Sequence, residues 1–221
     1  MSAQLVELPP LPGPATAGLA PAERARLVGR ARFLARLGLG WHLVEAAIAV
    51  GAGLAAGSIA LIGFGADSLV EAIAGAVVLW RFAAGRAHSE VAERRAQQLI
   101  AASFLAIAVY VAVEAVRTLV AGDHPEPSWV GIGLAAVTLA TMPPLAIAKA
   151  RVGEALGSSA TKSEGRQNML CAYLSVALLV GLGGNALAGL WWLDPVAALA
   201  IAGFAVKAGR DAWRGEDGCC S

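Results

Sequence analysis

The chain has 221 residues, of which 57% are hydrophobic and 15% are charged, and its formal net charge is +1. Soluble domains carry about 25% charged residues, so too few polar side chains remain here to cover the surface of a soluble domain. The same values exclude a disordered chain, a nucleic-acid binder that relies on bulk charge and a disulfide-stapled secreted domain, which leaves an integral membrane protein.

The first 37 residues are predicted to precede the membrane domain. Residues 1–21 contain five prolines from Pro9 onward and are expected to be disordered. The extreme N-terminus has neither a basic nor an apolar region of the kind found in cleavable signal peptides. Residues 22–37 contain five arginines and are predicted to form a basic amphipathic helix that lies on anionic lipid at the cytoplasmic surface.

Six apolar stretches follow, each close to the length of about 20 residues that a helix needs to cross a bilayer. They are continuous rather than alternating, which favours helices over a barrel. We therefore expect an all-α integral membrane protein whose six-helix bundle covers residues 38–208, followed by a short cytoplasmic tail over 209–221. The predicted spans are 38–56, 58–79, 99–120, 129–148, 169–189 and 191–206.

The basic residues fall almost entirely on one side of these spans. Of the 17 Lys and Arg residues, all but Arg117 lie before the first span, after the last, or in the loops that follow the second and fourth spans. Cytoplasmic loops hold such an excess. The pattern predicts a multi-pass protein of the cell membrane with both termini in the cytoplasm. Glu114 lies three residues before Arg117 and is expected to pair with it.

Two acids lie in the middle of the second span, which contains no basic residue. Asp67 and Glu71 are four residues apart and so share one helical face. Two ionised carboxylates side by side in a low dielectric repel each other, and a divalent cation or a shared proton removes the repulsion. The pair is therefore suited to alternate between a metal and protons. The alternative is that both acids pair with arginine or backbone donors of another helix.

Polar side chains also occur in the first and fifth spans. His42 and Glu45 share a face near the cytoplasmic end of the first span, where a gate, a proton relay and an interfacial pair are all open interpretations. A polar stripe at helical spacing marks the start of the fifth span and is expected to face the bundle interior. Its members are Glu164, Gln167, Cys171 and Ser175, with Asn168 adjoining.

Cysteine side chains offer soft metal ligands at two places. Cys171 lies within the polar stripe, where it is either a ligand for zinc or a similar metal, or a small buried hydrophobic residue. Cys219 and Cys220 end the tail beside two acids. That pair is a candidate for cytosolic metal capture or for palmitoylation.

The second span resembles the second transmembrane helix of the cation diffusion facilitator family. That family is known for six-helix transporters that export zinc and related divalent metals in exchange for protons, and its second helix carries two acids four residues apart. The Asp-Pro opening of the sixth span is also similar to the family. The resemblance extends over roughly Gly38 to Trp213. The residues that carry it are Ser58-Ile59-Ala60-Leu61, Gly65-Ala66-Asp67-Ser68-Leu69-Val70-Glu71 and Asp194-Pro195.

The resemblance implies a metal site shared by the second and fifth helices. The family's fifth helix carries another pair four apart, usually His or Asp followed by Asp, and here that pair falls on Gln167 and Cys171. The implied ligands are thus Asp67, Glu71, Gln167 and Cys171, with Glu164 and Ser175 as the alternative completion. Many family members carry a cytoplasmic domain after the sixth helix. We expect a short member without it, in which any homodimer forms through the transmembrane helices.

These observations predict a secondary transporter that exports a divalent metal cation, with zinc favoured, from the cytoplasm by proton antiport. Its expected partners are the metal ion, protons and the lipid bilayer, with no organic cofactor and no nucleic acid. Two alternatives stay open: a membrane protein that binds or senses metal without transporting it, and a proton-coupled transporter of organic cations. An enzyme is disfavoured, because the sequence has no HExxH motif, nucleophile–base pair or glycine-rich phosphate loop.

Overall fold

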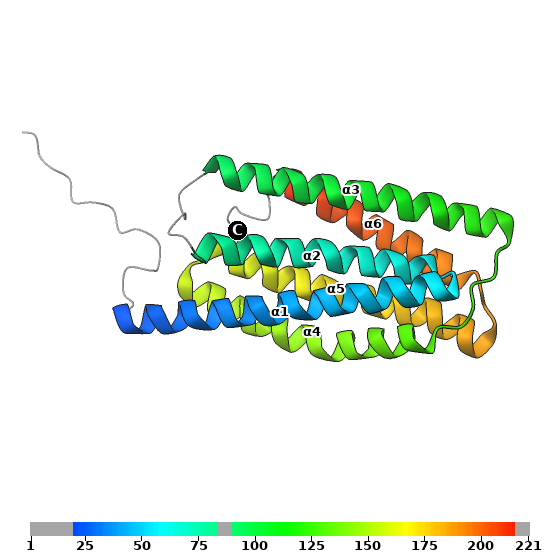
Figure 1. Ribbon diagram of the computed structural model, residues 1–221, viewed down its shortest axis with the longest axis horizontal. Coiled ribbons are helices and arrows are strands. Elements are labelled where there is room, and N and C mark those ends of the chain that lie inside the picture. The colour runs from blue at the N-terminus through cyan, green and yellow to red at the C-terminus, as the bar shows by residue number, and fades with distance from the viewer. Residues whose placement is uncertain (1–19, 84–89, 215–221) are drawn as a thin grey trace, which may run out of the picture.

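The computed structural model describes residues 20–83 and 90–214, and within these ranges it contains six α-helices and no strand. The helices lie lengthwise beside one another, and α1 begins at the end of the bundle toward which α6 runs (Figure 1). The predicted all-α fold is confirmed. The helices are α1 (Pro21–Ala56), α2 (Ile59–Ala83), α3 (Glu90–Ala121), α4 (Trp129–Leu156), α5 (Ser159–Ala188) and α6 (Leu193–Arg214).

Four helices surround the centre of the bundle. α1 packs on α2 and α4, α5 packs on α2 and α4, and the pair formed by α3 and α6 lies against α2 (Figure 1). The main core contains buried side chains from all six helices, with α3 and α6 contributing beside α1, α2, α4 and α5. Its largest fully buried apolar side chains include Leu61, Phe64, Met142 and Leu178.

Residues 22–37 continue directly into the first span, so α1 is a single helix. Ala31 and Leu34 in this segment pack against Val152 near the end of α4. The segment is therefore the first part of α1 and belongs to the bundle. Its contact with lipid stays a prediction.

The outer surface of the bundle is apolar, as a lipid environment requires. Leu54, Val109, Val180 and Leu187 are each more than half exposed, while polar side chains such as Glu45 are buried. Among the described residues, four helical segments are long and apolar enough to cross a membrane: Pro21–Ala56, Phe104–Ala121, Trp129–Leu156 and Glu164–Ala188.

The turn between α1 and α2 is tied to the start of α6. Gly57 ends α1 with a left-handed backbone (φ 67°), and its N–H donates to the carbonyl of Gly53. The Ser58 hydroxyl accepts from the N–H of Leu61 and donates to the Asp194 carboxylate, which also accepts from the N–H of Ala60. Asp194 therefore satisfies backbone groups that the first turn of α2 would otherwise leave unpaired.

Close helix contacts at two glycines determine the spacing around the centre. A Cβ added at Gly65 would lie 2.8 Å from Cγ2 of Val50, and one added at Gly165 would lie 2.9 Å from the carbonyl oxygen of Ala146. Only glycine permits these approaches of α2 to α1 and of α5 to α4. Polar side chains on the facing surfaces of these helices are thereby brought within bonding distance.

Candidate metal centre

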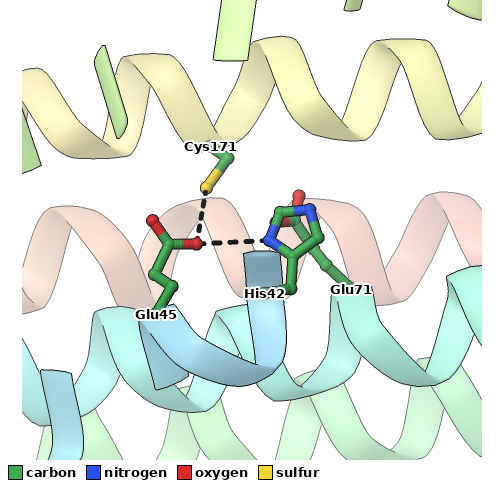
Figure 2. A group of neighbouring side chains, drawn as sticks. All are labelled: His42, Glu45, Glu71 and Cys171. Atoms are coloured by element: carbon green, nitrogen blue, oxygen red, sulfur yellow. Dashed lines mark hydrogen bonds and ion pairs between the residues drawn. The ribbon is translucent and has the colours of Figure 1, made fainter. Parts of the chain in front are cut away.

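Four potential metal ligands meet between α1, α2 and α5 (Figure 2). His42 and Glu45 come from α1, Glu71 from α2 and Cys171 from α5, and one ligand atom of each lies within 4.8 Å of all the others. All four residues are buried. One imidazole nitrogen, two carboxylate oxygens and one sulfur form a donor set of the kind that binds zinc and similar borderline-soft metals.

The Glu45 carboxylate has more side-chain contacts than any other member of this cluster. Its Oε2 accepts from the Ser68 hydroxyl at 2.9 Å, lies 3.2 Å from His42 Nδ1 and is contacted by the Cys171 thiol at 3.9 Å. Its Oε1 accepts from the hydroxyl of Thr138. These contacts come from four helices and hold a fully buried carboxylate in one orientation.

The Glu71 carboxylate has fewer hydrogen-bond partners than that of Glu45. Its Oε2 lies 3.1 Å from His42 Nδ1, yet among the described residues this buried oxygen has no partner in hydrogen-bonding geometry. Buried polar atoms are almost always satisfied, and an unsatisfied one costs about 1–3 kcal/mol. A cation bound between Glu71 and Glu45 would satisfy this oxygen.

The structure brings together two of the four ligands predicted from the sequence. Glu71 and Cys171 belong to the cluster. Asp67 is buried one helical turn before Glu71, closer to the α1–α2 turn, and is not one of the four clustered residues. Gln167 lies one turn before Cys171 and lines a small cavity that Glu71 also lines. The ligand set therefore remains a proposal.

The two α1 residues, for which the sequence left three interpretations open, supply half of the cluster. His42 and Glu45 are three residues apart, and that shared face was the only signal available from the sequence. Ser175, the alternative ligand, instead donates its hydroxyl to the carbonyl of Cys171 at 2.9 Å. Such i−4 bonding to the helix backbone is common for buried serines.

A second polar network adjoins the cluster and centres on Lys149 of α4. Its Nζ donates to Oδ1 of Asn168 at 2.9 Å and lies 3.6 Å from Oε1 of Glu164. Nδ2 of Asn168 lies 3.1 Å from Nε2 of His42 and 3.0 Å from the sulfur of Met142. Glu164 and Asn168, which the sequence placed in the polar stripe, therefore do face the bundle interior.

The burial of Lys149 is not evident from the sequence. The hydropathy pattern places this lysine in the loop after the fourth span, but α4 continues to Leu156 and the lysine side chain is only 2% exposed. A cavity of about 10 Å³, room for about one water molecule, is lined by residues of both this network and the cluster. Its lining residues are Leu39, His42, Glu71, Gly75, Lys149, Glu164, Gln167 and Asn168.

Two other predictions concern the periphery. Arg117 donates to Oε1 of Glu114 at 2.8 Å, which confirms the expected pair, and the arginine side chain is largely exposed. Cys219 and Cys220 lie outside the described residues.

A family model described as the cation efflux transmembrane domain matches residues 37–214. The match begins within α1, ends with α6 and so includes every residue of the cluster and of the Lys149 network. A search of curated proteins gives no match.

Proposed function

The chain belongs to the cation efflux family, the cation diffusion facilitators, and we propose that this metal cation efflux transporter carries a divalent metal, zinc before others, in exchange for protons. Membership confirms the resemblance noted in the sequence and makes the chain a multi-pass membrane protein of a transporter family. Zinc preference, proton exchange, cytoplasmic termini and a homodimer through the membrane helices are proposals.

The observation that carries the proposal is the cluster of His42, Glu45, Glu71 and Cys171. Zinc bonds of about 2.0–2.3 Å in a tetrahedron place ligand atoms about 3.3–3.8 Å apart. The ligand atoms here all lie within 4.8 Å of one another. Small side-chain rotations would therefore close the cluster onto one ion. Thiolate and imidazole ligands favour zinc, cobalt or cadmium over magnesium and calcium.

The chemistry of these ligands supports proton exchange. A thiol, an imidazole and carboxylates must be deprotonated to bind a metal, so binding releases protons. In a buried site, uncompensated negative charge is costly, which favours occupancy by either a metal or protons.

We assign Asp67, one turn before Glu71 on α2, to a neighbouring step of the same path, where it takes up a proton or receives the ion.

A flux assay in proteoliposomes tests the proposal. We expect zinc uptake driven by an opposing pH gradient and accompanied by proton movement, and we expect Glu71→Gln and Cys171→Ser each to abolish it. Glu114→Gln is the matched control, because Glu114 pairs with Arg117 at the exposed periphery.

The alternatives have distinct outcomes in the same assay. Zinc binding that depends on Glu71 without any flux would identify a metal-binding or sensing protein. Proton flux driven by organic cations and insensitive to zinc would identify an organic cation transporter. Either result would overturn the proposed function.

A further inference from the structure

Asn168 lies between the metal cluster and a buried ammonium group. Its Oδ1 accepts from Lys149 Nζ at 2.9 Å, and its Nδ2 lies 3.1 Å from Nε2 of His42 and 3.0 Å from the sulfur of Met142. Asn168 and Lys149 are each 2% exposed. The amide therefore joins the lysine to the imidazole that faces the proposed ligands.

The partners of Asn168 determine which way its amide points. A lysine ammonium can only donate hydrogen bonds, so the amide oxygen must face Lys149. The thioether sulfur of Met142 can only accept, so the amide NH₂ group faces Met142 and, with it, His42. Both contacts therefore select the same amide orientation.

This orientation determines which nitrogen of His42 carries the hydrogen. Because the amide NH₂ donates to Nε2, Nε2 must offer its lone pair, and the hydrogen of the neutral ring stays on Nδ1. Nδ1 lies 3.2 Å from Oε2 of Glu45 and 3.1 Å from Oε2 of Glu71, both of which are acceptors. The nitrogen that faces the metal cluster thus presents a hydrogen, not a lone pair.

We propose that Lys149 and Asn168 are positioning residues that hold His42 in this hydrogen-donating form and thereby weaken metal binding, which favours release. Histidines that bind metals almost always donate their other ring N–H to an acceptor, and here that second nitrogen meets a donor. Metal binding through Nδ1 requires the hydrogen on Nε2 and Oδ1 of Asn168 turned toward it. This inference rests on the proposed function, and it identifies Lys149 and Asn168 as residues that set the metal affinity of the proposed site.

Among the described residues, Glu164 is an alternative partner for Lys149. A Cβ added at Gly38 would lie 2.7 Å from Nζ, so α1 closes the space on that side. Glu164 Oε1 lies 3.6 Å from Nζ, and both side chains line the small cavity beside the cluster. Lys149 can therefore shift toward Glu164 and leave Asn168 free to turn, which makes the lysine the group that switches His42 between its two forms.

Binding measurements on the full chain in nanodiscs test this role. Asn168→Asp replaces the amide by a carboxylate that accepts from both Lys149 and Nε2 of His42. We expect this variant to bind Zn²⁺ and Co²⁺ at least about tenfold more tightly than wild type, because hydrogen-bond partners of metal ligands typically change metal affinity by about 10–100-fold. We also expect it to transport the metal more slowly. Gln167→Glu is the control, because it adds the same charge to the same cavity at the neighbouring position.

Nitrogen-15 NMR of the histidine rings shows which ring nitrogen carries the hydrogen, and so tests the role of Asn168 separately from the effect of added charge on metal affinity. His88→Gln and His124→Gln leave His42 as the only histidine of the chain. In the metal-free protein we expect hydrogen on Nδ1, and with Asn168→Asp we expect hydrogen on Nε2. Hydrogen on Nε2 without that substitution, or equal affinities of Asn168→Asp and Gln167→Glu, would overturn the inference. Failure of wild type to bind either metal would instead overturn the proposed function.

Discussion

Substitution of the two clustered glutamates by glutamine should change stability in opposite directions. Glu71 Oε2 is buried without a hydrogen bond among the described residues, whereas Glu45 accepts from Ser68 and Thr138. An unsatisfied buried polar atom costs about 1–3 kcal/mol. In Glu71→Gln an amide N–H that can donate to the nearby Glu45 carboxylate takes the place of this oxygen, so the variant should stabilise the metal-free protein. Hydrogen bonds to a charged group contribute about 1.5–3 kcal/mol, so Glu45→Gln should destabilise it by about that amount.

Thermal unfolding in detergent, with chelator and then with zinc, measures both effects. For a chain of this size, 1 kcal/mol shifts Tm by about 2–4 °C. Zinc at a hundredfold excess over its Kd adds about 2.7 kcal/mol to the wild type, and both variants should lose this increment because each lacks one ligand. A metal-free Glu71→Gln protein that is less stable than wild type, or one that keeps the zinc increment, would refute the reasoning.

Three further substitutions test the contacts around the site. Gly65→Ala brings a methyl group to 2.8 Å from Val50 and should cost about 1–3 kcal/mol, measured as a lower Tm. Ser58→Ala removes the hydroxyl that caps α2 and donates to Asp194, so it should cost about 1–3 kcal/mol in the same measurement. Asp67→Asn should reduce zinc flux at least tenfold while zinc affinity, measured by calorimetry, changes less than in Glu71→Gln. Equal losses of affinity in the two variants would place Asp67 among the ligands.

The fold could be predicted from the sequence because the signals that define it are local. Long apolar runs specify helices in a membrane. Three of the six predicted spans are contained within helices of the structure, and each of the other three extends only one or two residues beyond the end of its helix. The end of α4 is a helix boundary whose difference from the prediction affects the site. The hydropathy pattern ends before Lys149, but the helix continues through Leu156 and carries the lysine into the bundle.

The site could be predicted only in part because it depends on the relative depth of different helices. Asp67 and Glu71 share a face, yet four residues separate them by about 6 Å along the axis, so one ion does not meet both equally. The depth at which His42 and Glu45 meet Glu71 is set by close packing of α1 on α2 at Gly65. A single sequence carries no direct signal for that register.

X-ray absorption at the zinc edge tests the central claim most directly. The sample is the full chain with Cys219→Ser and Cys220→Ser, which leaves Cys171 as the only cysteine. The account predicts one zinc per chain with one sulfur at about 2.3 Å and nitrogen or oxygen ligands at about 2.0–2.2 Å, and predicts loss of the sulfur when Cys171→Ser is added. A shell of nitrogen and oxygen alone before that addition would contradict it.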